Sequence, residues 1–322
     1  MMSLLKNTAD NLFFIVGCGR SGTTLLKTML NCHPDISIPH ETFFFTSITK
    51  DLDGFDSSTQ SKINVLKSKW WIQDMEPDFE EIQSRLSSDK APWSEVFLSF
   101  LTEVTSQEAS VFGEKTPSHV LKSKDLLERY PAARVIQIVR DPRAVCSSFK
   151  TSKVGPIHLH PCVKEWKNSA QISKALQSNQ RYKQIKFESL IQSTEQVLAE
   201  LCHFLNLEYC DQMLDFDKRE KSGFSKEQSH HKNTLLPIFS ENINQWKHKL
   251  TGNQISLIEH TLKNEMATLG YGCVKNKVLL PKTQLACSFV LDKFHKTFVR
   301  KPRQIKKQKN AIRRLSRDKK QE

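Results

Sequence analysis

Short strand-like runs alternate with helical patterns along most of the chain. Residues 12–16, 111–113, 134–139 and 182–187 predict strands, and each is followed by apolar residues at helical spacing. Strands that alternate with helices indicate a parallel sheet whose connections are crossover helices. The pattern therefore predicts the α/β class.

Between residues 46 and 107 the pattern changes to several amphipathic helices. We expect this segment to be a helical insertion, and further helices are predicted over 162–176, 194–205 and 252–269. The insertion could roof a substrate cleft, but core packing is the favoured role of its individual aromatic residues. These residues are Trp70, Trp71, Phe79, Trp93, Phe97 and Phe100.

The composition indicates a folded globular chain. Its 322 residues are 38% hydrophobic, which is enough for a core, and no apolar run approaches the roughly 20 residues that cross a bilayer. The eight cysteines form no CxxC pair and are expected to be reduced. The first strand starts near residue 12, which leaves no room for an anchor before it. We therefore expect a cytoplasmic location.

The formal charge of +13 is concentrated in the last part of the chain. Residues 293–322 contain 13 Lys or Arg against Asp318 and Glu322. We predict one domain over residues 1–275 and a basic C-terminal extension over 276–322. The extension is expected to be solvated, with an electrostatic contact to an anionic membrane or nucleic acid as the alternative.

The first predicted strand runs through a glycine-containing loop into a helix. Residues 17–24 read GCGRSGTT, the spacing of the nucleotide-binding G-x-x-x-x-G-K-[ST] loop, except that Thr23 replaces the lysine. Such a loop binds phosphate through backbone N–H groups and the following helix. Without that lysine, Mg-dependent hydrolysis of a nucleoside triphosphate is disfavoured and a simpler phosphate fits. The alternative is a tight turn without a ligand.

A second strand and helix meet at residues 134–143. Arg140 is expected at the carboxyl end of the strand, which is where ligands bind in open α/β sheets. Ser147 and Ser148 follow on the helix and could donate hydroxyl groups to a second phosphate. Arg140 and the first loop are therefore expected to face one crevice. The alternative is a surface pair of Arg140 with Asp141, beside ordinary helical serines.

Together these two junctions resemble the sulfotransferases that use 3′-phosphoadenosine 5′-phosphosulfate (PAPS), over roughly residues 12–272. The resemblance implies a P-loop NTPase-like three-layer fold with a central parallel sheet flanked by helices. It implies PAPS as the co-substrate, with the 5′-phosphosulfate held by the first loop and the 3′-phosphate by the second junction. The donor-binding residues that it implies are Arg20, Ser21, Gly22, Thr23, Thr24, Arg140 and Ser148.

Three further features are closer to the tyrosylprotein sulfotransferase branch and its bacterial relatives. They are HPD at residues 33–35, Glu41, and EKTP at residues 114–117. In that branch a glutamate at the position of Glu41 is the general base, and a lysine at the position of Lys115 assists the leaving group. The resemblance thus implies Glu41, Lys115 and Arg20 as catalytic residues. One base and fixed cations suffice for sulfuryl transfer, so no metal is expected.

The chain departs from that branch at two positions. Gln245 stands where the branch has a cation just before a tryptophan, so Lys247 or Lys249 would have to replace it. Phe187 lacks the hydroxyl group that is common at its position, so one nucleotide contact is expected to be missing. Because the secretory enzymes of the branch have an amino-terminal anchor, we regard tyrosine of secretory proteins as a poor candidate acceptor.

We therefore predict transfer of a sulfuryl group from PAPS to a hydroxyl group of a carbohydrate, lipid, small metabolite or peptide tyrosine. Glu41 is expected to act as the base of an in-line, metal-independent reaction. His40 is the competing base, since imidazole titrates nearer neutrality. Two other functions stay open. One is a P-loop kinase of a small metabolite, which would need Mg²⁺, and the other is a non-catalytic anion-binding module with a basic tail.

Overall fold

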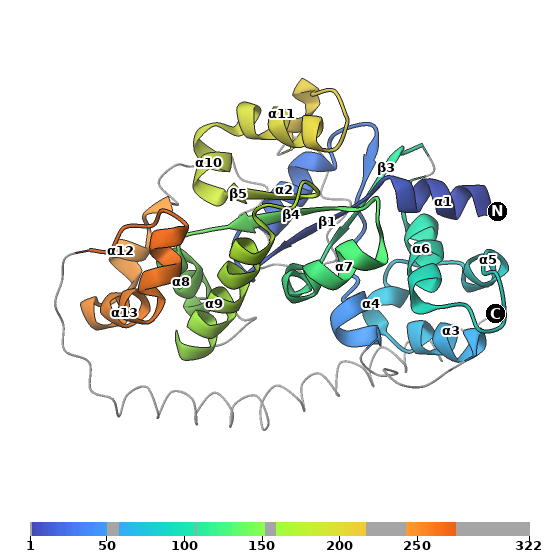
Figure 1. Cartoon of the computed structure of the whole chain (residues 1–322), viewed down its shortest axis with the longest axis horizontal. Helices are drawn as coiled ribbons and strands as arrows, with labels where there is room; N and C mark the ends of the chain where they lie inside the picture. Colours follow the sequence, from blue (N-terminus) through green and yellow to red (C-terminus); the bar gives the residue numbers. More distant parts are fainter. Residues whose placement is uncertain (1, 50–57, 107, 152–158, 217–242, 275–322) are drawn as a thin grey trace, which may run out of the picture.

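A parallel sheet of five strands forms the centre of the described part of the protein (Figure 1). The computed structural model describes residues 2–49, 58–106, 108–151, 159–216 and 243–274. The strand order is β2-β3-β1-β4-β5, and every neighbouring pair is parallel. The α/β prediction is confirmed. The strands are β1 (Leu12–Gly17), β2 (Ile36–Ser37), β3 (Val111–Lys115), β4 (Arg134–Val139) and β5 (Tyr182–Lys186).

Strand β1 lies in the middle of the sheet and is buried along its whole length. Phe13 and Ile15 pack into the core on one face, whereas Phe14 and Val16 pack into the core on the other. Because helices cover both faces, the strand is apolar throughout instead of alternating with polar residues. The carboxyl ends of β1, β3 and β4 lie at the same edge of the sheet.

Helices cover the two faces and so make three layers (Figure 1). The face of Phe13 is covered by α2 (Thr23–Leu30), α10 (Phe187–Gln192), α11 (Thr194–Phe204) and the 3₁₀ helix η4 (Asp211–Leu214). The opposite face is covered by the π-helix η1 (Phe44–Ile48), α6 (Trp93–Val104), the 3₁₀ helix η3 (Pro117–Lys122), α7 (Ser123–Arg129) and α9 (Leu159–Leu176).

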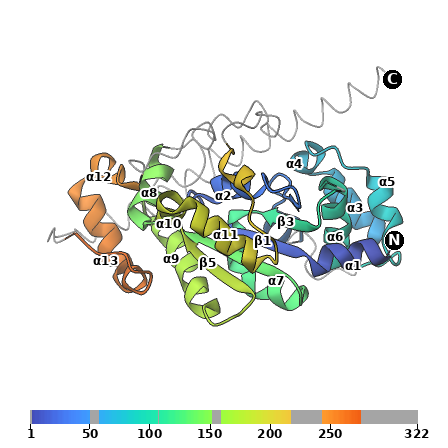
Figure 2. The ribbon, with the colours of Figure 1, turned by 90° about the horizontal axis from the view of Figure 1, so that it is seen from above.

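Several helices lie in the stretch for which an insertion is predicted. They are α3 (Thr59–Lys67), α4 (Trp70–Gln73), α5 (Phe79–Ser84) and α6, and they gather at one end of the molecule with α1 (Met2–Asp10) (Figures 1 and 2). Phe97 and Phe100 are fully buried, which confirms the core prediction for these two residues. Trp71, Phe79 and Trp93 pack against the same core and stay partly exposed.

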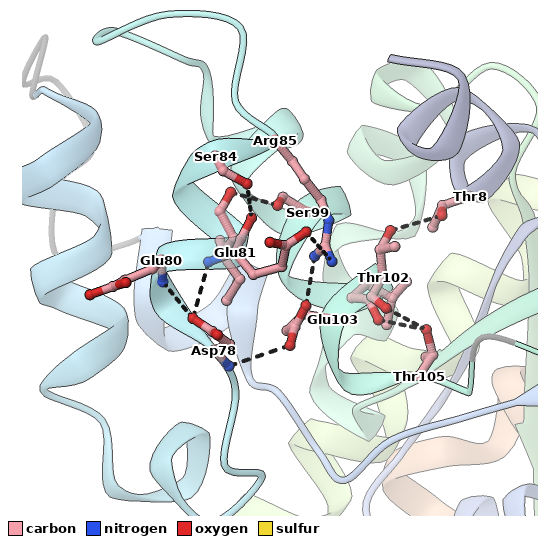
Figure 3. Close-up of polar contacts among 12 residues, drawn as sticks. Thr8, Asp78, Glu80, Glu81, Ser84, Arg85, Ser99, Thr102, Glu103 and Thr105 are labelled. Atoms are coloured by element: carbon pink, nitrogen blue, oxygen red, sulfur yellow. Dashed lines mark hydrogen bonds and ion pairs between the residues drawn. The ribbon is translucent and has the colours of Figure 1, made fainter. Parts of the chain in front are cut away.

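Polar contacts join these helices to one another (Figure 3). Arg85 at the end of α5 donates to Glu103 of α6 at 2.7 Å and pairs with Glu81 at 3.0 Å. Thr8 of α1 shares a hydrogen bond of 2.8 Å with Thr102 of α6. These contacts hold the amino-terminal helix and the insertion together as one unit.

A buried ion network attaches the last helices to the sheet domain. Arg143 of α8 (Pro142–Thr151) donates to Asp141 at 2.6 Å and to Glu259 of α13 (Gly252–Thr268) at 2.6 Å. Its guanidinium also lies 4.1 Å from the ring centroid of Trp246 in α12 (Trp246–Lys249). All three charged side chains are at least nine-tenths buried. One arginine therefore compensates two largely buried carboxylates.

The predicted division into residues 1–275 and a basic extension over 276–322 stays a prediction, because residues 275–322 lie outside the described part of the chain. Among the helices of the described residues, none is long and apolar enough to cross a membrane.

Arg143→Met should lower the free energy of unfolding by about 3–5 kcal/mol, because it leaves two buried carboxylates without their cation. Urea unfolding at pH 7 measures the loss. Lys124→Met removes a cation of an exposed pair with Glu128 and should change stability by less than about 1 kcal/mol. Equal losses in the two variants would contradict this role of Arg143.

Candidate active site

The loop between β1 and α2 has a backbone that only some residues adopt without strain. Arg20 has φ 68° and Gly22, directly before α2, has φ 105°, so both lie in the left-handed region. The hydroxyl of buried Ser21 donates to the carbonyl of Cys18 at 2.7 Å and closes the turn. This geometry directs the loop into the amino-terminal end of α2, where backbone N–H groups can bind an anion.

The neighbours of Gly22 leave no room for a side chain at this position. A Cβ atom at this position would lie 2.8 Å from Cε2 of Phe187, and one at Gly17 would lie 2.6 Å from the carbonyl oxygen of Ile138. The loop therefore packs directly on β4 and on the start of α10. Phe187 itself is buried.

The two strand-to-helix junctions that contain Arg20 and Arg140, called here the two basic junctions, meet at one edge of the sheet. Arg140 at the end of β4 donates from Nη1 to the backbone oxygen of Arg20 at 3.4 Å, and Nε of Arg20 donates to Oγ of Ser148 on α8 at 3.1 Å. Arg20, Arg140 and Ser148 thus lie together at one edge of the sheet. Burial lowers the pKa of both guanidinium groups, and it is opposed by Glu41 at Arg20 and by Glu188 at Arg140.

Three residues that support this corner were not identified from the sequence. The indole of Trp166 on α9 donates to the carbonyl of Arg140 at 2.8 Å, and the carboxylate of Glu188 accepts from the N–H of Asp141 at 2.9 Å. Glu165 accepts from the N–H of Gly19 at 3.1 Å. Each lies on a helix far along the chain from the residue that it holds, so no local pattern pointed to it.

The predicted base and the predicted leaving-group cation are in contact. Lys115 at the end of β3 is 3% exposed and forms an ion pair with Glu41. Its Nζ also donates to Oγ1 of Thr24 at 3.3 Å. A single ammonium group therefore joins the carboxylate to the first turn of α2.

The charges of this pair act on two further titratable groups. The pKa of His40 is lowered to about 4, by burial and then by the positive charges of Lys27 and Lys115, against the opposing effect of Glu41. The pKa of Lys27, on α2, is lowered to about 7 by burial and by Lys115. Lys27 had no assigned role in the sequence analysis, which could not place it beside β3.

Glu114 has a different environment from its neighbour Lys115. Its carboxylate is fully buried and accepts hydrogen bonds from Thr42 at 2.8 Å, Thr116 at 2.6 Å and Nδ1 of His119 at 2.8 Å. Burial by itself raises the pKa of Glu114, but His119 and the hydroxyl donors lower it below its ordinary value. Glu114 therefore fixes the segment that follows Glu41 and does not pair with Lys115.

Lys247, Lys249 and His33 make contacts of other kinds. Nζ of Lys247 lies 5.8 Å from the ring centroid of Trp246, and Nζ of Lys249 donates to the side chain of Gln245. Neither contact joins the two basic junctions. His33 of the HPD sequence bonds to the carbonyl of Glu208 at 2.8 Å and holds the chain after α11.

Within the described residues, no group of three or more His, Cys, Asp and Glu side chains could hold a metal ion. The cysteines among these residues are free thiols.

Comparison with known proteins identifies the family. The model of the sulfotransferase family matches residues 13–211, and the chain belongs to this family. Protein-tyrosine sulfotransferase 2 of Gallus gallus is 22% identical over 275 residues, which cover 81% of this chain and 69% of the relative. Protein-tyrosine sulfotransferase 1 of Homo sapiens is 31% identical over 147 residues, 44% of this chain and 35% of the relative.

Two solved structures share the fold. The sulfotransferase domain from the curacin biosynthetic pathway has a TM-score of 0.58 and 20% identity, and covers 81% of this chain and 98% of its own. The sulfotransferase domain of the Synechococcus PCC 7002 olefin synthase has a TM-score of 0.58 and 19% identity, with coverages of 82% and 95%. The predicted P-loop-like fold with a helix-flanked parallel sheet is confirmed. Family membership also favours the predicted sulfotransferase over the two alternatives, a metabolite kinase and a non-catalytic module.

Gly22→Ala should lower the free energy of unfolding by about 1–3 kcal/mol, because the new Cβ needs both a left-handed backbone and a displaced Phe187 ring. Thermal or urea unfolding measures the loss. Gly252→Ala is the matched control, since nothing lies within 4 Å of its Cβ position. That variant should be neutral or more stable by up to about 1 kcal/mol. If Gly22→Ala were as stable as Gly252→Ala, the described loop geometry would be wrong.

Proposed function

We propose that this protein transfers a sulfuryl group from PAPS to the hydroxyl group of an acceptor, with Glu41 as the general base. The observation that carries the proposal is the position of Lys115, whose Nζ contacts both Glu41 and Thr24. This contact places a base and a cation beside a loop that has the geometry of an anion site. Membership of the sulfotransferase family supports the same reaction.

The donor fits the two basic junctions. Residues 20–24 would bind the 5′-phosphosulfate through backbone N–H groups and hydroxyls, and Arg140 with Ser148 would bind the 3′-phosphate. The fit rests on the left-handed backbone of Arg20 and Gly22 and on two adjacent guanidinium groups whose pKa is lowered by burial. A dianionic ligand would compensate the desolvation of these two like charges.

When bound, PAPS supplies the sulfuryl group and a phosphate leaving group. The acceptor oxygen bonds to sulfur as the bond between sulfur and the phosphate oxygen breaks, and Glu41 takes the hydroxyl proton. Lys115 and Arg20 would stabilise the negative charge that grows on the sulfonate and the leaving oxygen, because their own charges are held in fixed positions. These groups supply both the base and the charge stabilisation of the proposed step.

Glu41 is a better candidate for the base than His40. Its carboxylate contacts Lys115, whereas burial and the nearby lysines lower the pKa of the His40 imidazole to about 4, into the ordinary range of a carboxylate. This environment removes the advantage that an unperturbed histidine would have. Glu41 also precedes Thr42, which the buried carboxylate of Glu114 holds in place.

We propose a tyrosine hydroxyl as the acceptor, supported by relatives named protein-tyrosine sulfotransferases. The names of these relatives outweigh the argument from an expected absence of an anchor, which disfavours tyrosine of secretory proteins. The cytoplasmic location and the membrane or nucleic-acid contact of the basic extension stay predictions.

Glu41→Gln should reduce kcat about 10²- to 10⁴-fold because it removes the proton acceptor while keeping the shape of the side chain. The assay uses labelled PAPS and a tyrosine peptide, with the phenylalanine version of the peptide as a blank and a hydroxyl-bearing sugar as an alternative acceptor. His40→Gln is the matched control and should keep kcat within about tenfold. A larger loss in His40→Gln than in Glu41→Gln would assign the base to His40.

Arg140→Ala should weaken binding of adenosine 3′,5′-bisphosphate by about 1.5–3 kcal/mol, the contribution of a hydrogen bond to a charged group. Titration calorimetry measures the affinity. Lys249→Ala removes an exposed cation that contacts Gln245 and should bind the nucleotide as the unmodified protein does. Tight binding that survives in Arg140→Ala would exclude Arg140 from the donor site.

A further inference from the structure

The ring of Phe187 lies between the two basic junctions. Cζ of Arg140 is 4.0 Å from the ring centroid, and the same ring packs against Gly22 of the first loop. Phe187 is the first residue of α10, directly after β5, and is only 7% exposed. One rigid side chain therefore touches elements that are more than 100 residues apart in the sequence.

The carboxylates near Arg140 have other partners. Glu188 accepts from the N–H of Asp141 at 2.9 Å and from the hydroxyl of Tyr271 at 2.9 Å. The carboxylate of Asp141 accepts from Arg143. The negative charges of both acids also act on the Arg140 guanidinium and raise its pKa, against the effect of burial.

An aromatic ring and a carboxylate bind a guanidinium group in different ways. The ring attracts the flat face of the guanidinium, whereas a carboxylate binds its N–H edge. The N–H edge is also what a phosphate binds in the bidentate manner. A ring under Arg140 can thus orient and stabilise the buried charge without competing with a phosphate ligand.

We propose that Phe187 is a positioning residue of the donor site, which holds the Arg140 guanidinium in the orientation that selects nucleotides with a 3′-phosphate. The inference rests on the proposed function, because it needs Arg140 to bind that phosphate. The hydroxyl group whose absence was noted in the sequence is not needed for this role. The ring face performs it, and Gly22 fixes where the ring lies.

The test compares Phe187→Leu with Phe187→Tyr. Leucine keeps an apolar group against Gly22 but has no aromatic face, whereas tyrosine keeps the face. Calorimetry gives the affinities for adenosine 3′,5′-bisphosphate and for adenosine 5′-monophosphate, which lacks the 3′-phosphate. Phe187→Leu should weaken the bisphosphate about 5- to 30-fold and the monophosphate less than about threefold. Phe187→Tyr should stay within about threefold of the unmodified protein for both.

Two controls separate positioning from a general structural role. Leu190→Ala truncates a fully buried residue of the same helix and core, so it should lower Tm without changing the ratio of the two affinities. In an Arg140→Ala background, Phe187→Leu should cause no further loss for the bisphosphate. Phe187→Met is made in parallel, so that one variant without an aromatic face is available if leucine is not tolerated.

The outcomes are distinct. An equal loss for both nucleotides in Phe187→Leu, no loss for either, or an additive loss with Arg140→Ala would overturn the positioning role. If the unmodified protein bound the bisphosphate no better than the monophosphate, the proposed donor site itself would be wrong. A selective loss that tyrosine prevents supports the proposal.

Discussion

The parallel register of the sheet is the constraint on which the candidate site depends. Because β1 lies between β3 and β4, the loop after β1, the ammonium of Lys115 and the guanidinium of Arg140 emerge at one edge. A parallel sheet presents all its carboxyl ends on one side, so residues from three separate segments need no long loops to meet there. Shifting β1 by one residue would exchange the side chains on its two faces and so disturb the packing of both cores.

The site concentrates positive charge in a partly buried place, and the surrounding residues determine how that charge is held. Lys115 is paired with Glu41, while Arg140 lies on the ring of Phe187. The nearby acids Asp141 and Glu188 also accept hydrogen bonds from Arg143 and from the backbone N–H of Asp141. Several cations held in a partly buried place suit a strongly anionic ligand, because the charge of the ligand would compensate their desolvation.

Much of the architecture could be predicted from the sequence because its signals are local. The strand at β1 is a continuous apolar run, and the loop after it has a glycine spacing that few other structures require. Strand β2 was missed because its two residues show no periodicity. The carboxyl-terminal helices were predicted close to their observed bounds, since each has apolar residues at helical spacing. Helix α1 was not predicted, and its packing on α6 is a tertiary contact.

The sequence by itself determined the fold class, the glycine-containing loop after β1 and the identity of the basic residues near it, since these depend on periodicity and on spacing within one segment. Only the tertiary structure decided which groups pair. Glu114 and Lys115 are adjacent in the sequence, but adjacent residues of a strand point to opposite faces, so Lys115 reaches Glu41 and Glu114 reaches His119. The supports from Trp166, Glu188 and Phe187 were likewise decided by packing, because contacts between distant segments exist only once the sheet and its helices have assembled.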